Sequence, residues 1–89
     1  MPPESVLAID AGTQTVRAAL VAPDGSVRDL ATSRLRLSTP QPGWAEQDPE
    51  RWWAATASNI TAVMGRNPGT RVAAVAVCGQ MHGVVALDA

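Results

Sequence analysis

The feature that most constrains the fold of this chain is an apolar run near its C-terminal end, Val72 to Cys78, which contains no polar residue. Such a run predicts a strand that is covered on both faces, as central parallel strands are when a crossover helix leads into them. The sequence before it offers both a helix and earlier strands. We therefore predict an α/β fold with a mixed sheet.

The helix that precedes this strand has a clear start and end. Asp48 can cap free backbone N–H groups, Pro49 suits the first helical position, and Glu50 complements the positive end of the helix dipole. The helix is expected to run to about Met64 and to stop in the glycine- and proline-containing segment 65–69. One face should pack on the sheet through residues at three- and four-residue spacing: Trp53, Thr56, Ala57, Ile60, Val63 and Met64.

The N-terminal third of the chain predicts three strands joined by hairpins. An apolar strand from Ser5 ends at Asp10, and a second runs from Val16 to Val21. The Asp-Gly turn at 24–25 leads into a third, over 27–37, whose alternating pattern leaves a basic face in water. That face is typical of a solvated edge strand.

The first turn contains residues that suit phosphate chemistry. Gly12 permits unusual backbone angles and close approach of a ligand, while Thr13 and Gln14 offer N–H groups and side chains to an anion. Asp10 would act on phosphates through a divalent cation, and Arg17 would return positive charge. An ordinary tight hairpin with an exposed acid remains the alternative for this motif alone.

A second polar loop follows the apolar run. If the first and last predicted strands are parallel neighbours, Gly12-Thr13 and Gly79 to Gly83 open on the same cleft beyond the strand ends. Gln80 and His82 could then hydrogen-bond hydroxyl groups and Met81 could pack on a carbon skeleton. A structural histidine is the alternative. The sequence shows no side-chain metal site, dinucleotide fingerprint or P-loop.

The proline-rich segment 38–47 is predicted to be a loop. Trp44 and Glu46 within it could flank a polar small molecule, with the indole against C–H groups and the acid on a hydroxyl. The alternative for Trp44 is that it pins the loop to the core.

Composition narrows the class of protein. The 89 residues are 46% hydrophobic with a formal net charge of -1, which predicts one small domain at most and no electrostatic footprint for nucleic acid or an anionic membrane. The single cysteine, Cys78, is expected to be a buried structural thiol in a reducing compartment. With no signal peptide or membrane span in sight, we expect a soluble, cytoplasmic protein.

Three stretches together resemble one family in order and spacing. They are Asp10 to Arg17, Pro42 to Trp53 and Gly79 to Gly83. The family is the FGGY carbohydrate kinases, most closely the xylulokinases, and the resemblance covers almost all of the chain after Glu4. The first stretch is shared with actin-like and heat-shock ATPases, the second narrows the match to FGGY kinases, and the Gln-Met-His loop favours xylulose over glycerol.

The resemblance implies a ribonuclease-H-like (actin-like ATPase) fold, with residues 1–89 as an incomplete first domain and the second domain absent. It implies ATP and Mg²⁺ as cofactors and a pentulose as substrate, D-xylulose giving D-xylulose 5-phosphate. Asp10 resembles the acid that organises magnesium and the transferring phosphate. Gly12, Thr13, Gln14 and Arg17 resemble the phosphate-loop contacts, although xylulokinases often have lysine where Arg17 stands. Gln80, Met81 and His82 match the sugar-binding loop.

Several alternatives stay open from the sequence. The substrate of the full protein could be ribulose, gluconate or glycerol, and a homodimer of that protein is compatible with the family. A non-catalytic actin-like nucleotide-binding module would share only the first turn, and a small α/β domain without a ligand would make both polar loops accidental. In family members the catalytic base and the adenine pocket lie further along the chain, so we expect the 89 residues alone to be inactive and poorly folded.

Overall fold

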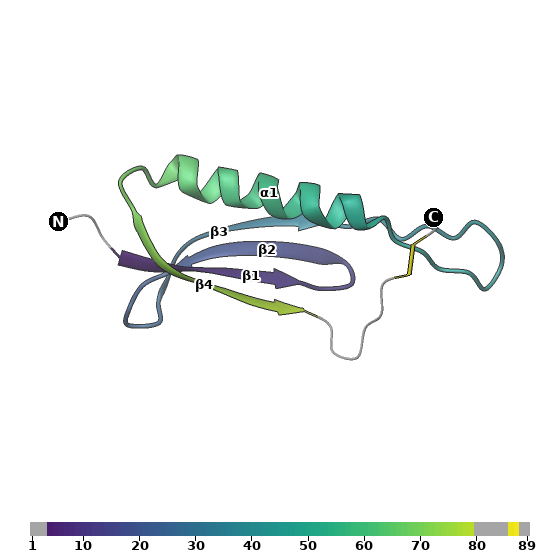
Figure 1. Cartoon of the computed structure of the whole chain (residues 1–89), viewed down its shortest axis with the longest axis horizontal. Coiled ribbons are helices and arrows are strands. Elements are labelled where there is room, and N and C mark those ends of the chain that lie inside the picture. The colour runs from purple at the N-terminus through teal and green to yellow at the C-terminus, as the bar shows by residue number, and fades with distance from the viewer. Residues whose placement is uncertain (1–3, 80–85, 88–89) are drawn as a thin grey trace.

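A computed structural model describes residues 4–79 and 86–87 of the chain (Figure 1). A four-stranded sheet has the order β3-β2-β1-β4, and one helix packs on it. The elements are β1 (Glu4–Ala11), β2 (Thr15–Val21), β3 (Val27–Arg34), α1 (Pro49–Arg66) and β4 (Arg71–Gly79). The first three strands are antiparallel neighbours, whereas β4 runs parallel to β1. The predicted mixed α/β sheet is confirmed.

The hairpin between β2 and β3 follows from its turn residues. Gly25 has a φ of 91°, a left-handed conformation that glycine adopts without a steric cost. The carboxylate of Asp24 accepts hydrogen bonds from the backbone N–H and the hydroxyl of Ser26, at 2.9 and 2.6 Å. β3 ends at Arg34, three residues earlier than the alternating pattern predicts, and forms the edge of the sheet as expected.

α1 begins where the sequence predicts, because the carboxylate of Asp48 accepts a hydrogen bond from the N–H of Glu50 at 3.0 Å and Pro49 occupies the first turn. The helix continues through Gly65 and is capped by Asn67. No helix within the described part of the chain is long and apolar enough to span a membrane.

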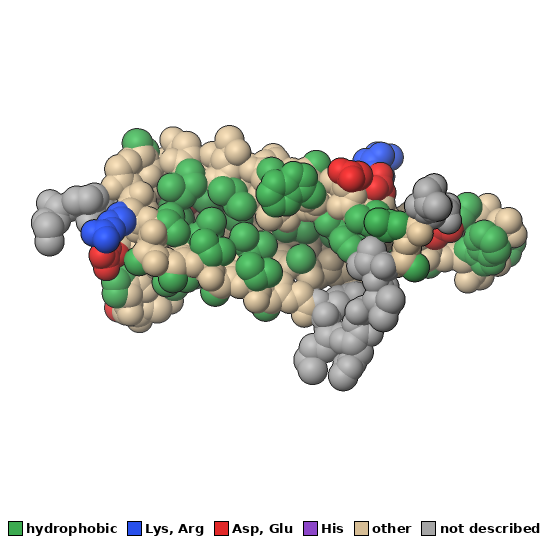
Figure 2. Space-filling model, viewed as in Figure 1, with side chains coloured by type: hydrophobic (Ala, Val, Ile, Leu, Met, Phe, Trp, Pro, Cys, Tyr) green, Lys and Arg blue, Asp and Glu red, His purple; other side chains and the backbone are tan. Residues whose placement is uncertain are grey.

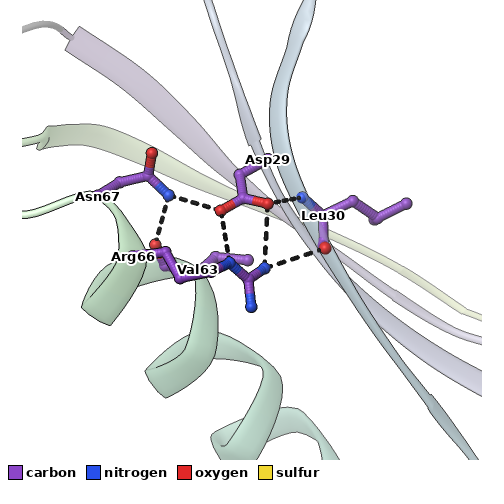
Figure 3. Close-up of polar contacts among 5 residues, drawn as sticks. All are labelled: Asp29, Leu30, Val63, Arg66 and Asn67. Atoms are coloured by element: carbon purple, nitrogen blue, oxygen red, sulfur yellow. Dashed lines mark hydrogen bonds and ion pairs between the residues drawn. The ribbon is translucent and has the colours of Figure 1, made fainter.

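A polar cluster attaches the C-terminal end of α1 to β3 (Figure 3). The guanidinium of Arg66 donates to both carboxylate oxygens of Asp29, at 2.9 and 3.0 Å. The amide of Asn67 donates to the same carboxylate at 2.7 Å, and the N–H of Leu30 donates at 2.8 Å. These hydrogen bonds, Arg66 first among them, hold the pKa of Asp29 well below its usual value of 3.8.

The hydrophobic core lies between α1 and the strands β1 and β2. Its buried members are Leu7, Ala18, Leu20 and Val63, with Ile9, Ala31, Ile60, Met64 and Val72 packed around them. Trp53, predicted to face this core, is instead 67% exposed, and its neighbour Trp52 is half-buried. The prediction for Trp53 was wrong. Neighbouring helix positions differ in direction by about 100°, and which of them faces the core depends on the strands on which the helix packs.

The expectation that β4 is covered on both faces is also wrong for the described residues. α1 packs on β2 and β3 and reaches β1 only briefly, so β4 beyond Val72 is exposed. Val75 and Val77 are 59% and 70% exposed, and Figure 2 shows hydrophobic side chains along the face between α1 and β4. Cys78, predicted to be buried, is exposed for the same reason.

Candidate functional site

One end of the molecule brings together those parts of the predicted site segments that the structure describes. The carboxyl ends of β1 and β4 point towards it, and the N-terminal end of α1 and the loop that precedes the helix lie there too (Figure 1). Ala11 and Gly79 are register partners at the ends of the two parallel strands. The expected parallel pairing of the first and last strands is therefore confirmed, and it places Gly12 and Gly79 at the same end of the sheet.

Asp10 stands at this edge between a cation and a thiol. Its register partners are Arg17 on β2 and Cys78 on β4, so the three side chains share one face of the sheet. Because Leu7 and Ile9 alternate with Asp10 and pack towards α1, this face is the one away from the helix. Together with apolar residues from all four strands the three line an open hollow of about 240 Å³.

The ion pair in this hollow is loose. Arg17 Nη1 lies 4.0 Å from Asp10 Oδ2, and about half of each side chain is exposed to solvent. Hydrogen bonding to the neighbouring Asp10 carboxylate, with partial desolvation and the charge of Asp10, raises the pKa of Cys78. Both charged groups keep room for additional ligands.

The turn between β1 and β2 is held by three segments of the chain. The N–H of Gly12 donates to the carbonyl of Thr15 at 2.9 Å, and the N–H of Leu35 donates to the carbonyl of Gln14 at 2.8 Å. The side-chain amide of Gln47 donates to the carbonyl of Thr13. The turn is thus a fixed platform at the strand ends, with the side chains of Thr13 and Gln14 exposed.

The glycines at this edge differ in what they require. The backbone angle expected to demand glycine at residue 12 is not found, since the described glycines with positive φ are Gly25, Gly43 and Gly69. A Cβ on Gly12 would lie 3.4 Å from the Thr15 carbonyl oxygen, in ordinary contact. A Cβ on Gly79 would lie 3.3 Å from the Ala11 carbonyl oxygen, a tighter contact. Close strand packing therefore favours glycine at 79.

Two residues that support the site were missed in the sequence. Gln47 accepts a hydrogen bond from the indole N–H of Trp52 at 3.2 Å while its amide reaches the turn. Asn59, 3% exposed, donates to the carbonyl of Val16 at 2.8 Å and accepts from the hydroxyl of Ser33 at 2.7 Å. In the sequence, Asn59 is marked only as a polar residue within the mostly apolar predicted face of the helix. Gln47 is marked only by its place directly before the N-cap residue Asp48.

The remaining predicted residues fall into two groups. Trp44 is 53% exposed and Glu46 is exposed, in a loop closed by an antiparallel bridge between Ser38 and Glu46. Trp44 therefore does not pin the loop to the core, and both side chains are available to a ligand. The predicted residues Gln80, Met81 and His82 lie outside the described residues.

A divalent cation fits at these strand ends only when phosphate oxygens and water supply most of its ligands. Residues 4–79 and 86–87 contain no group of three His, Cys, Asp or Glu side chains that could hold a metal ion. Asp10 offers one accessible carboxylate. Mg²⁺ suits such a site, because it is commonly held by one or two carboxylates with phosphate oxygens and water.

Comparison with known proteins places these features in one family. Residues 5–89 match the model of the N-terminal domain of the FGGY family of carbohydrate kinases. A xylulose kinase from Escherichia coli K12 is 41% identical over 83 residues, which are 93% of this chain and 17% of the relative. A glycerol kinase from Gloeobacter violaceus is 35% identical over 85 residues, 96% of this chain and again 17% of the relative.

A solved structure agrees. The xylulose kinase from Rhodospirillum rubrum superposes with a TM-score of 0.81 at 30% identity, over 86% of this chain and 16% of that one. The actin-like fold expected for the chain is thereby confirmed as part of that larger fold. The chain spans about a sixth of the length of the relatives it matches.

Proposed function

Because the chain belongs to the FGGY family of carbohydrate kinases, we propose that it supplies the phosphate-binding part of an ATP-dependent pentulose kinase. The reaction is the phosphorylation of D-xylulose to D-xylulose 5-phosphate by the full-length protein. Residues 1–89 form the N-terminal portion of its first domain, and the general base and adenine pocket lie in the rest of the protein.

The observation that carries this proposal is the open ion pair beside the turn. Asp10 and Arg17 lie on one face of the sheet, 4.0 Å apart and half exposed, on the two strands that flank the turn Gly12 to Gln14. Phosphoryl transfer needs positioned charges of both signs around the β- and γ-phosphates rather than covalent catalysis by the protein. A loose ion pair at a strand end provides a positive and a negative side chain, and each of them can still bind a ligand.

The two charges have separate roles in this scheme. Asp10 holds the magnesium ion that accompanies the phosphates, since a carboxylate in direct contact with them would be repelled. Mg²⁺, when bound, neutralises charge on the phosphate oxygens. Arg17 adds positive charge from the neighbouring strand. The turn presents backbone N–H groups of Thr13 and Gln14 to the phosphates.

The sugar is proposed to lie beyond the end of β4. Gln80, Met81 and His82 follow Gly79, which adjoins the turn in register, so a hydroxyl bound there would be near the transferred phosphate. Trp44 and Glu46 are both exposed, and the loop that carries them lies at the same end of the molecule (Figure 1), so they are further candidates for sugar contact. Xylulose is favoured by the Gln-Met-His loop.

Substrate-dependent ADP release by the full-length protein tests the proposal. D-xylulose, L-ribulose, gluconate and glycerol are compared at equal concentration with saturating MgATP. The proposal predicts the highest kcat/KM for D-xylulose. Equal, marginal turnover of all four compounds would refute the sugar-kinase assignment, and turnover of another sugar alone would keep the kinase and refute the substrate. Glycerol is the alternative with specific support, because the matched relatives include a glycerol kinase.

A further inference from the structure

Gln47 connects the phosphate turn to the helix through one side chain. Its amide nitrogen donates to the carbonyl of Thr13, and its amide oxygen accepts from the indole N–H of Trp52 at 3.2 Å. We propose that Gln47 is a positioning residue of the kinase, which sets the orientation of the Thr13–Gln14 peptide for phosphate binding and ties it to Trp52. This inference rests on the proposed function.

The geometry of the peptide bond explains how Gln47 acts at a distance. The described peptides are all trans, so the carbonyl of Thr13 and the N–H of Gln14 belong to one plane and point in opposite directions. When Gln47 holds the carbonyl towards the helix side, the N–H of Gln14 points away from it. That N–H is one of the donors offered to the phosphates, so the Gln47 amide fixes the direction of a donor it does not touch.

The support for Gln47 is itself anchored. Trp52 is half-buried, and its carbonyl accepts a hydrogen bond from the hydroxyl of Thr56 at 2.7 Å in the first turns of α1. On its other side, Gln47 directly follows the bridge between Ser38 and Glu46 that closes the loop. The turn therefore takes its orientation from the base of the loop that carries Trp44 and Glu46.

Only a side chain with both a donor and an acceptor makes these two bonds. A glutamate at 47 keeps an acceptor for the Trp52 indole but places a carboxylate against the Thr13 carbonyl, which removes the hydrogen bond to the turn. Phenylalanine at 52 does the reverse, because it removes the indole donor and leaves the bond from Gln47 to Thr13 intact. The two substitutions separate the contact with the turn from the contact with the helix.

The test uses the full-length protein and steady-state kinetics in which ATP and D-xylulose are varied separately. Gln47→Glu is expected to lower kcat/KM for ATP about tenfold, the loss typical of one broken hydrogen bond, and to change KM for the sugar less than about twofold. Trp52→Phe is expected to lower kcat/KM for ATP about threefold, because the contact with the turn persists. Gln41→Glu, the same charge change at an exposed position of the neighbouring loop, is the matched control and should match the parent.

Each result decides the proposal. Equal kinetics of Gln47→Glu and the parent would overturn it, as would a lowered unfolding temperature with equal losses towards ATP and the sugar, which is the signature of a structural role. If Gln47→Glu does not fold, Gln47→Met replaces it with the same expected loss towards ATP and the same refuting results. Absence of ATP turnover in the parent protein refutes the proposed function and this inference together, whereas an active parent with an unaffected variant refutes this inference alone.

Discussion

Among the described residues, two aspartate–arginine pairs are built in opposite ways. Asp29 on β3 and Arg66 at the end of α1 form a bidentate ion pair at 2.9 and 3.0 Å (Figure 3). The same carboxylate also accepts hydrogen bonds from Asn67 and Leu30. Asp10 and Arg17, on neighbouring strands, approach only to 4.0 Å. The Asp29 side chain is 22% exposed, whereas that of Asp10 is 52% exposed.

The difference separates a structural pair from one suited to chemistry. A carboxylate whose oxygens already accept hydrogen bonds on all sides has little capacity left for a ligand, and it strengthens the attachment of a helix to its sheet. A carboxylate with a distant partner and an accessible face retains that capacity. The charged residues are the same in both pairs, so the surrounding donors determine their use.

The largest effect expected from this comparison is on catalysis. In the full-length kinase, Asp10→Asn should lower kcat by on the order of 100-fold, because a group that organises charge on the transferring phosphate is lost. Its unfolding temperature should stay near that of the parent, since the pair is loose. Steady-state ADP release and a thermal melt measure the two quantities. A kcat within threefold of the parent would contradict the role of Asp10.

The matched substitution in the other pair should have the reverse profile. Asp29→Asn should lower the unfolding temperature by roughly 2 °C, because the two-pronged bond to Arg66 weakens, while kcat stays within about twofold. The same melt and the same assay check it. A catalytic loss comparable with that of Asp10→Asn would remove the distinction between the pairs.

The pH dependence of stability should also separate them. The pKa of Asp29 is lowered in the folded state, so the folded protein binds fewer protons there than the unfolded one, and the pair's stabilisation is present above the usual value of 3.8. It is lost as the pH falls from about 5 through that value. Unfolding temperatures measured over this range should fall less steeply for Asp29→Asn than for the parent. Parallel curves would show that the pair does not contribute.

The smallest expected effect is on the reactivity of Cys78. Because the Asp10 carboxylate raises the pKa of this thiol, Asp10→Asn should increase its rate of alkylation near pH 8 by roughly threefold. Bound MgADP should slow alkylation in the parent by covering the hollow. Mass-spectrometric quantification of modified Cys78 measures both. A rate unaffected by Asp10→Asn would show that the two groups do not interact.

Local sequence patterns predicted most of the fold. The capping residues Asp48 and Pro49 fixed the start of α1, and the Asp-Gly turn fixed the β2–β3 hairpin. The parallel pairing of β1 and β4 also followed from the order of strands and helix. These features depend on residues close in the chain or on the few connections that a short α/β chain allows.

The predictions that failed concerned coverage by distant elements. The apolar sequence of β4 carries no information on how much of the sheet α1 covers. The exposure of Val75 and Cys78 could therefore not be predicted from that sequence. The choice between Trp52 and Trp53 depended on the strands beneath the helix. In the site, Asp10 and Arg17 were found from their motif, whereas the support from Gln47 depends on contacts between segments far apart in the sequence.

The central claim is that the open pair beside the first turn binds the phosphates of the nucleotide. Titration calorimetry of the full-length protein with MgADP tests it most directly, with Asp10→Asn, Asp29→Asn and the parent compared side by side. We predict that Asp10→Asn weakens binding at least about tenfold, as expected for a lost charged contact, and that Asp29→Asn binds like the parent. Equal affinity of all three proteins for MgADP would contradict the account.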